Sequence, residues 1–144
     1  MKLVLQRVKN ASVTIENNLY SQIKKGILIL IGIEKGDTES DIIKYAEKVS
    51  KLRIFPDEND KMNLSIKDIN GEILVVSQFT LAGDCKKGTR PSFDKSAPPE
   101  EANRLYELFV QQLKNLDIPV QTGVFGAMMD VALTNDGPVT FILG

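Results

Sequence analysis

Apolar and polar residues near the N-terminus alternate with the period of a β-strand. We predict strands over Leu3–Val8 and Ser12–Ile15, followed by a polar turn at Glu16–Asn18 that sends the chain back. The next segment, Gly26–Ile33, is a continuous apolar run with the length of a buried strand. Because this run has no polar face, we predict that it is a central strand covered on both sides.

Helical periodicity begins after this strand. Apolar residues recur at three- and four-residue steps from Ile42 to Leu52, and Asp37 or Thr38 can cap the N-terminus of the helix. A second helix is predicted after Pro98 and Pro99, because a first helical turn tolerates proline. Its buried face consists of Ala102, Leu105, Tyr106, Phe109, Leu113 and Leu116.

Strand patterns outnumber these two helices. Further strands are predicted at Glu72–Phe79, Val120–Val124, Met129–Leu133 and Val139–Leu143, with a polar loop at Pro56–Asp60. The pattern predicts one α/β domain over residues 1–144: a strongly curved, barrel-like mixed sheet with two helices packed outside. Strands at both chain ends leave sheet edges that need covering, and a homodimer would cover them.

Composition narrows the class of protein. Hydrophobic residues make up 42% of the chain and charged residues 26%, which is typical of globular proteins. No run approaches the ~18 consecutive apolar residues of a membrane span, and the N-terminus lacks an apolar signal region. The single cysteine, Cys85, rules out an internal disulfide. We therefore expect a cytoplasmic protein without a membrane partner.

The chain contains no histidine. This excludes Ser-His-Asp and Cys-His catalysis, and it excludes histidine-ligated metal. The acidic segment Asp57–Asp60 lacks the glycine and the closing glutamate of a calcium loop. We expect neither a metal nor a cofactor, so any chemistry must use backbone groups, hydroxyls, carboxylates, lysines or the substrate itself.

Two polar segments, Ser77–Leu81 and Asn135–Thr140, follow predicted strands and suggest a rigid polar pocket on the sheet. With other segments they make the chain resemble the D-aminoacyl-tRNA deacylase (D-tyrosyl-tRNA deacylase) family almost from end to end. The further matching segments are Gln6–Val8, Ala11–Val13, Leu52–Phe55, Lys61–Ser65, Arg90–Phe93 and Phe125–Ala127 with Met129. The resemblance implies a homodimeric hydrolase with active sites at the dimer interface. Its substrates would be the esters of D-aminoacyl-tRNA and glycyl-tRNA, and no DNA partner is expected.

Gly137 and Pro138 are the candidate chiral filter. Read alone, this dipeptide is a turn between strands. The resemblance implies a cis peptide whose carbonyl oxygens enter the partner subunit's pocket, accept hydrogen bonds from the substrate amino group and exclude an L-side chain. Glycine has no side chain to exclude, so glycyl-tRNA would pass the same filter. The resemblance also implies that Arg7 holds these carbonyls in place, although a strand-edge arginine reaching solvent is the alternative.

Ser77, Gln78, Phe79 and Thr80 are the candidate catalytic residues. The Ser77 hydroxyl and the Phe79 amide can stabilise the oxyanion that develops on the ester carbonyl, while Gln78 holds a water or the ribose. Thr80 as a nucleophile is the alternative, but it has no histidine base and no lysine at Ser-x-x-Lys spacing. The resemblance implies that the 2′-hydroxyl of the terminal adenosine assists the reaction.

Two further groups of residues concern RNA binding. The resemblance assigns Phe79, Ala97, Phe125 and Met129 to the terminal adenosine, although core packing explains each of them read singly. Lys86, Lys87 and Arg90 form a cationic loop that either contacts tRNA phosphates or is simply solvated. Two rival functions remain: a non-catalytic module that binds the tRNA 3′-end, and an esterase with Thr80 as nucleophile.

Overall fold

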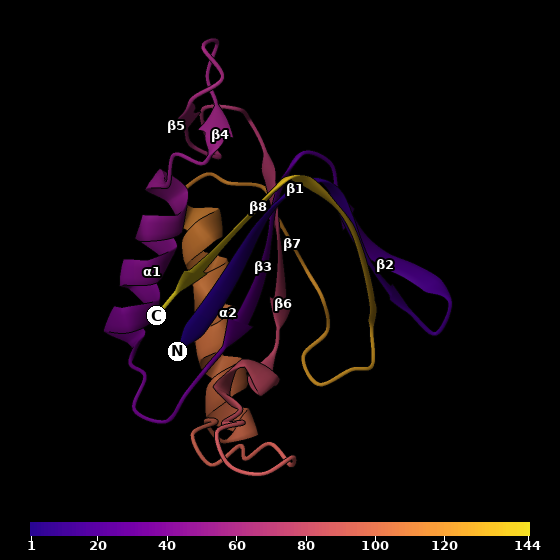
Figure 1. Cartoon of the computed structure of the whole chain (residues 1–144), viewed down its shortest axis with the longest axis vertical. Coiled ribbons are helices and arrows are strands. Elements are labelled where there is room, and N and C mark those ends of the chain that lie inside the picture. Colours follow the sequence, from indigo (N-terminus) through magenta and orange to yellow (C-terminus); the bar gives the residue numbers. More distant parts are fainter.

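The computed structural model describes every residue from Met1 to Gly144. In chain order the elements are β1 (Lys2–Ile15), β2 (Asn18–Ile23), β3 (Gly26–Gly32), α1 (Glu39–Lys51), β4 (Phe55–Pro56), β5 (Met62–Leu64), β6 (Glu72–Ser77), the 3₁₀ helix η1 (Phe79–Ala82), α2 (Pro99–Asn115), β7 (Val120–Thr122) and β8 (Asp130–Leu143). The predicted class, an α/β domain with two α-helices and a curved mixed sheet, is confirmed (Figure 1).

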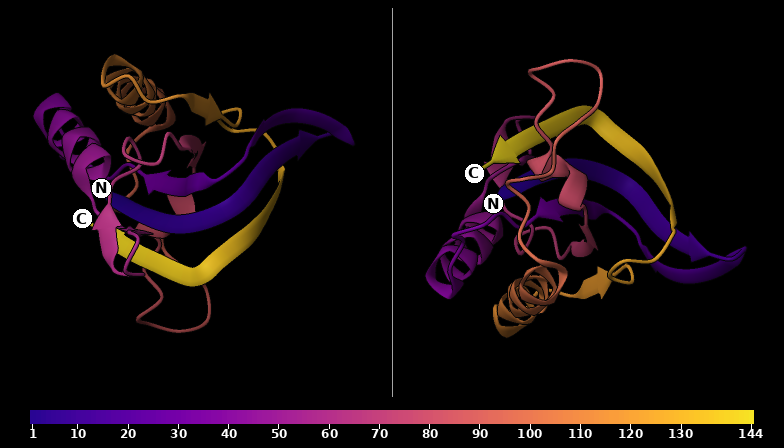
Figure 2. Two further views of the ribbon diagram at one scale, coloured as in Figure 1. Left: turned by 90° about the horizontal axis from the view of Figure 1, so that it is seen from above. Right: turned by 90° about the horizontal axis from the view of Figure 1, so that it is seen from below.

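The main sheet is built around β3. Its strand order is β2-β1-β3-β6-β7, and β8 lies along the remaining edge of β1. β6 runs parallel to both β3 and β7, whereas β1 pairs antiparallel with β2, β3 and β8. The sheet curls so far that the Ser21 hydroxyl on β2 donates a 2.7 Å hydrogen bond to the Thr122 carbonyl on β7. This contact makes the sheet a nearly closed barrel, with both helices on one side of it (Figure 2).

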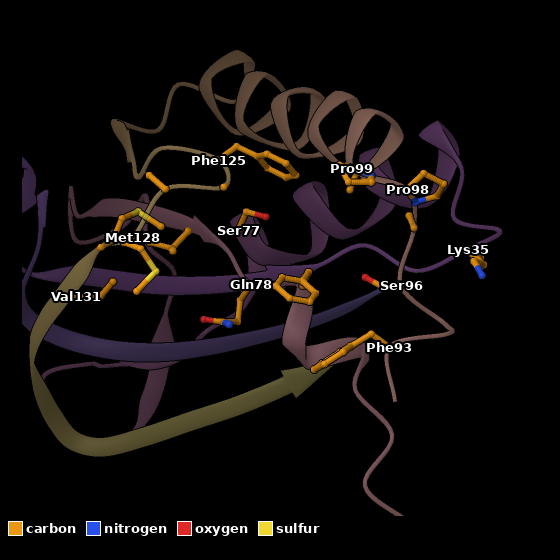
Figure 3. Close-up of a pocket in the computed structure, with 17 residues that line it drawn as sticks. Lys35, Ser77, Gln78, Phe93, Ser96, Pro98, Pro99, Phe125, Met128 and Val131 are labelled. Carbon is orange, nitrogen blue, oxygen red and sulfur yellow. The ribbon is translucent and has the colours of Figure 1, made fainter. Parts of the chain in front are cut away.

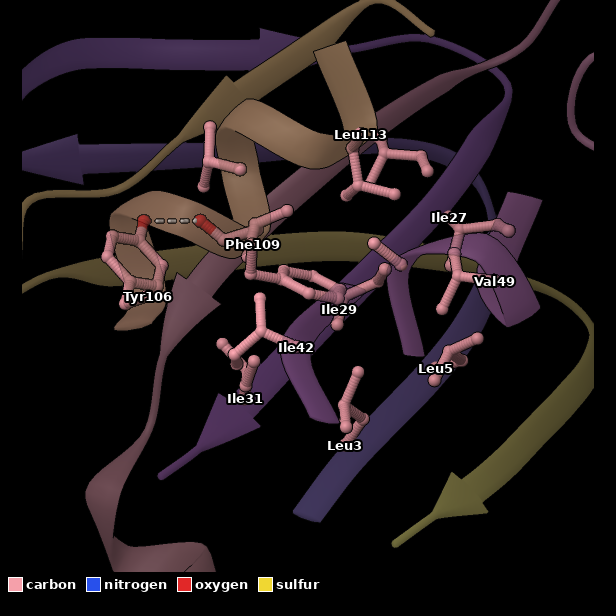
Figure 4. Packing of buried hydrophobic residues seen from close by; sticks show 14 of the residues in the cluster. Leu3, Leu5, Ile27, Ile29, Ile31, Ile42, Val49, Tyr106, Phe109 and Leu113 are labelled. Atoms are coloured by element: carbon pink, nitrogen blue, oxygen red, sulfur yellow. Dashed lines mark hydrogen bonds between the residues drawn. The ribbon is translucent and has the colours of Figure 1, made fainter. Parts of the chain in front are cut away.

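Apolar cores lie on both faces of this sheet. The larger one contains 23 buried residues from the sheet and from α1 and α2, among them Ile27, Ile29 and Ile31 of β3 (Figure 4). The smaller one contains 7 buried residues and includes Leu28. Alternate residues of a strand point to opposite faces, so β3 is apolar on both, as predicted. Each fully buried aliphatic side chain contributes about 1.5–3 kcal/mol.

The helices begin where the sequence predicts. Thr38 is the N-cap of α1, where its hydroxyl accepts the Asp41 amide and the Asp41 carboxylate accepts the Thr38 amide in a capping box. α2 begins with Pro98 at the N-cap and Pro99 in the first turn. No α-helix of the chain is both long enough and apolar enough to cross a lipid bilayer.

The first and the last strand of the chain are longer than predicted. β1 runs unbroken over both predicted N-terminal strands, and β8 joins the two predicted C-terminal ones. Their register leaves residues 136–139 of β8 opposite the single residue Arg7 of β1. A bulge of this kind accommodates Pro138, which has no amide hydrogen to donate to a neighbouring strand. Pairing with the continuous β1 therefore holds β8 together where the sequence alone favours a turn.

Two smaller differences concern chain connections. The strand predicted to reach Phe79 ends at Ser77, because η1 begins at Phe79 and turns the chain away from the sheet. The predicted polar loop over Pro56–Asp60 is confirmed in part: it forms the turn of the short hairpin between β4 and β5.

Removing the Thr38 hydroxyl is expected to weaken α1. We expect Thr38→Ala to lower the free energy of unfolding by about 1 kcal/mol, because the Asp41 amide loses its acceptor. Thr38→Ser keeps the hydroxyl and is the matched control, with a change of only a few tenths of a kcal/mol. Urea unfolding of the three proteins measures this, and equal losses in both variants would contradict the capping role.

Candidate active site

A cavity of about 800 Å³ opens at the carboxyl end of β6. Its walls come from that strand end, from η1, from the segment leading into α2, and from the loop between β7 and β8. Figure 3 shows Ser77 near its middle, Phe125 on the α2 side, and Lys35 at the end opposite Met128. The lining is mostly apolar with a few polar groups, which is typical of a small-molecule site.

The end of β6 positions Ser77 and Gln78 in the wall of this cavity. β6 is buried from Ile73 to Val76 and becomes half-buried at Ser77. The Gln78 amide continues the pairing with β3 by donating a 2.8 Å hydrogen bond to the Ile31 carbonyl. The polar residues therefore begin where the strand leaves the core, and the backbone that carries them is fixed by the central sheet.

The structure brings three of the four candidate catalytic residues together. Ser77, Gln78 and Phe79 line the cavity. Thr80 does not line it: this residue is exposed on η1, and its hydroxyl accepts a hydrogen bond from the Gln78 side-chain amide. Phe79 is the first residue of η1, where amide N–H groups have no acceptor within the helix. The geometry therefore favours a supporting position for Thr80.

The four residues assigned to the adenosine share the same cavity. Phe79, Ala97, Phe125 and Met129 all line it. The Phe79 ring is 54% exposed and packs against Phe93 with ring centroids 5.2 Å apart. Together they present an apolar surface of the kind on which nucleobases stack.

Arg7 is buried beneath the bulge of β8. Its guanidinium donates hydrogen bonds of 3.1 Å to the Asp136 carbonyl and 2.7 Å to the Ile54 carbonyl, and it pairs with the Asp136 carboxylate at 3.4 Å. The hydrogen bond therefore falls on the carbonyl of the residue before Gly137, and none is made to the Gly137 or Pro138 carbonyls that Arg7 was expected to hold. The peptide bond between Gly137 and Pro138 is cis.

Gly137 and Pro138 do not line the cavity of their own chain. Both are exposed on β8, whose outer edge pairs with no other strand. Phe141 and Ile142, further along this strand, are 39% and 71% exposed. The structure of one chain therefore separates the candidate filter from the candidate catalytic residues.

The three candidate phosphate-binding cations lie on the exposed loop between η1 and α2. Lys86 lines a second, smaller cavity of about 390 Å³. Lys87 and Arg90 line neither of these two cavities. The loop is thus a cationic surface next to the active-site region, and of these three candidate cations only Lys86 lines a defined cavity.

Comparison with known proteins identifies the family. The family model described as D-Tyr-tRNA(Tyr) deacylase matches residues 4–144. The chain belongs to this family. A relative named D-aminoacyl-tRNA deacylase, from Thermodesulfovibrio yellowstonii, is 59% identical over 143 residues, which cover 99% of this chain and 98% of the relative. The chain is accordingly an enzyme of the hydrolase class.

Solved structures share the fold. The structure of a protein named c-Myc DNA Unwinding Element Binding Protein has a TM-score of 0.94 and 41% identity, covering 100% of this chain and 98% of that one. A structure described as a probable eukaryotic D-amino acid tRNA deacylase has a TM-score of 0.86, covering 99% of this chain and 97% of that one. At 16% identity, this second likeness shows the fold alone.

Eleven of the 17 residues that line the cavity were not assigned to the site from the sequence, and three of these eleven have a polar or aromatic side chain. These three are Lys35, Phe93 and Ser96. Phe93 lies in one of the segments that match the family, so a signal for it was present. Lys35 had none, because it reaches the cavity through long-range pairing: its amide donates a 2.9 Å hydrogen bond to the Lys95 carbonyl.

Tyr106 of α2 fixes the strand and the loop that form two of the cavity walls. Its hydroxyl donates a 3.0 Å hydrogen bond to the Val75 carbonyl, which also accepts the Gly123 amide at 3.2 Å. The Tyr106 ring packs on Phe125, with ring centroids 6.1 Å apart. Burial raises the pKa of Tyr106 to about 12. The side chain is therefore held neutral, as a donor, at the junction of β6 and the Phe125 loop.

This raised pKa predicts a stability change at alkaline pH. An unfolded tyrosine titrates near pH ~10, so the stabilisation by Tyr106 is complete below that pH and is lost as pH rises towards about 12. We expect Tyr106→Phe to cost about 1 kcal/mol of unfolding free energy at neutral pH. The difference in unfolding free energy between the parent and Tyr106→Phe should vanish by roughly pH 11. At about one pH unit above the pKa of an unfolded tyrosine, the parent has lost about 1.4 kcal/mol, which is enough to cancel its advantage. Urea unfolding at both pH values measures it, and an unchanged difference would refute the assignment.

Proposed function

We propose that the chain hydrolyses the ester bond of D-aminoacyl-tRNA, and of glycyl-tRNA, to free tRNA and amino acid. The observation that carries the proposal is the single cavity shared by Ser77, Gln78 and Phe79 with the apolar walls at Phe125 and Met129. A hydroxyl beside a surface for base stacking suits an ester attached to a terminal adenosine. Family membership over residues 4–144 supports the same substrate class.

The proposed reaction is the attack of water on the ester carbonyl carbon. The Ser77 hydroxyl and the Phe79 amide donate to the carbonyl oxygen as it becomes negative, and Gln78 positions the water or the ribose. The bond between the carbonyl carbon and the ribose oxygen then breaks, the ribose oxygen takes a proton, and the amino acid leaves with a free carboxyl group. The neighbouring 2′-hydroxyl assists by orienting the water, so no protein base is required.

Selection against L-amino acids is proposed to depend on a second copy of the chain. Gly137 and Pro138 are exposed and lie outside the cavity of their own chain. In a homodimer they would enter the partner's cavity, where their carbonyl oxygens would accept the substrate amino group and exclude an L-side chain. Support comes from the unpaired edge of β8 with its exposed Phe141 and Ile142, because such an edge favours pairing with another chain.

One alternative is a non-catalytic module that binds nucleic-acid ends. The observation in its favour is the name of a solved relative at 41% identity, c-Myc DNA Unwinding Element Binding Protein. The polar residues Ser77 and Gln78 among the apolar walls of the cavity favour catalysis, because stacking alone does not require oxyanion donors there.

The substrate proposal is tested with D-tyrosyl-tRNA, L-tyrosyl-tRNA and glycyl-tRNA at equal concentrations. We expect release of amino acid from the D-tyrosyl and glycyl esters and none above background from the L-tyrosyl ester. Equal release from both tyrosyl esters would overturn the filter but leave a hydrolase. Binding of tRNA without release from any ester would support the binding-module alternative.

Substitution of Ser77 and of Thr80 is expected to affect turnover differently, because the two hydroxyls have different roles. Ser77→Ala should lower kcat by about 10²–10³-fold through loss of an oxyanion donor. Thr80→Ala should retain measurable turnover, because Thr80 lies outside the cavity. Complete loss in Thr80→Ala, with the fold intact by circular dichroism, would support the esterase alternative with Thr80 as nucleophile.

Substrate assistance has its own test. We expect D-tyrosyl-tRNA ending in 2′-deoxyadenosine to bind but not to be hydrolysed, because the group that orients the water is absent. Turnover of this substrate at the rate of the ribose form would contradict the proposed role of the 2′-hydroxyl.

A further inference from the structure

The second cavity, of about 390 Å³, is strongly cationic. Three lysines line it: Lys2 at the start of β1, and Lys86 and Lys95 from the loop between η1 and α2. None of the three forms a salt bridge. Asp84 is the one acidic residue in the lining, so the charges there sum to +2. A chain with net charge −1 has no overall field to attract a polyanion, so such a local cluster is the feature that can do so.

Asp84 shapes this cavity and offsets only one of its three positive charges. Its carboxylate accepts the Lys86 amide at 2.9 Å. Its backbone exchanges two hydrogen bonds with Ser92, of 2.7 and 3.0 Å, which close the loop between them. The Lys86 amide, followed by the charges of Lys95, Lys86 and Lys2, holds the pKa of Asp84 below its usual range. The carboxylate is thus engaged by the loop backbone, while the ammonium groups remain available to a ligand.

The two cavities lie on opposite sides of the same two segments. In the first segment, η1 and its C-cap, Phe79 lines the active-site cavity, whereas Ala82 and Gly83 line the cationic one. In the second segment, Phe93 and Ser96 line the active-site cavity and Lys95 lines the cationic one. The cationic cavity is therefore a neighbour of the adenosine surface at Phe79 and Phe93, with only these two segments between them.

We propose that the cationic cavity formed by Lys2, Lys86 and Lys95 binds a phosphodiester group of the tRNA strand immediately 5′ of the terminal adenosine. The inference rests on the proposed function, because it assumes that the adenosine occupies the neighbouring cavity. It adds Lys2 and Lys95, which are far apart in sequence, to the substrate-binding surface. The cluster acts on affinity and positioning, and the chemistry stays at Ser77 and Phe79.

The test compares D-tyrosyl-tRNA with 3′-O-D-tyrosyl-adenosine, which has no phosphate. For the triple variant Lys2→Gln, Lys86→Gln, Lys95→Gln we expect KM for D-tyrosyl-tRNA to rise about tenfold at unchanged kcat. The slope of log KM against log salt should fall by about 0.7 for each phosphate that the cavity no longer neutralises. The corresponding triple lysine-to-arginine variant keeps the charges and should stay near the parent. A charge-matched control replaces three exposed lysines elsewhere, Lys51, Lys67 and Lys114, by glutamine.

The outcomes separate this inference from the proposed function. A KM and a salt slope equal to those of the charge-matched control would overturn the phosphate site while leaving the deacylase proposal intact. An equal rise of KM for 3′-O-D-tyrosyl-adenosine would also overturn it, because that substrate has nothing for the cavity to bind. If the parent chain hydrolysed neither substrate, the proposed function and this inference would fall together. Should the triple variant not fold, Lys95→Gln alone is expected to lower the salt slope by part of the amount that one phosphate contributes, whereas Lys51→Gln should leave the slope unchanged.

Discussion

The parallel pairing of β3 with β6 is the constraint on which the site depends. β3 is buried on both faces, and each residue of β6 from Glu72 to Ser77 pairs with it in register. The Gln78 amide adds one more hydrogen bond, to Ile31, before the chain turns into η1. Apolar burial thereby fixes the backbone that carries Ser77, Gln78 and Phe79 without any interaction specific to catalysis. Donors fixed in this way need little reorganisation when charge develops on a substrate oxygen.

A second constraint joins the outer strand to the same framework. Arg7 is only 8% exposed, and its guanidinium links the Asp136 carbonyl of β8 to the Ile54 carbonyl near the hairpin of β4 and β5. A buried guanidinium is costly unless acceptors surround it, and here two carbonyls and one carboxylate do so. The bulge that carries Gly137 and Pro138 is held in position as a result. This explains how a dipeptide exposed on an outer strand can still be presented with a defined geometry.

Much of this arrangement was predictable from the sequence, and the rest depends on long-range register. The apolar run of β3 and the helical periods predicted the layers correctly, since burial on one or two faces leaves a direct pattern. The polar residues from Ser77 onwards and the apolar wall at Phe125 and Met129 were also predicted, with the family resemblance, although the strand was expected to continue to Phe79. The continuity of β8 was not predicted from the sequence. Gly137-Pro138 read alone favours a turn, and only the pairing with β1 overrides this local preference. The positions of Lys35 and Lys95 follow from pairing between distant loops, which no local pattern encodes.

The central claim is that the chiral filter and the oxyanion donors of one site come from two copies of the chain. The most direct measurement uses a purified heterodimer in which one chain carries Ser77→Ala and the other Pro138→Ala, assayed with L-tyrosyl-tRNA beside the Pro138→Ala homodimer. The account predicts that the homodimer hydrolyses the L-ester and the heterodimer rejects it, because the one intact Ser77 faces an intact Gly137-Pro138 from the partner. Hydrolysis of the L-ester by the heterodimer at half the homodimer rate would place the filter in the same chain as Ser77 and contradict the account.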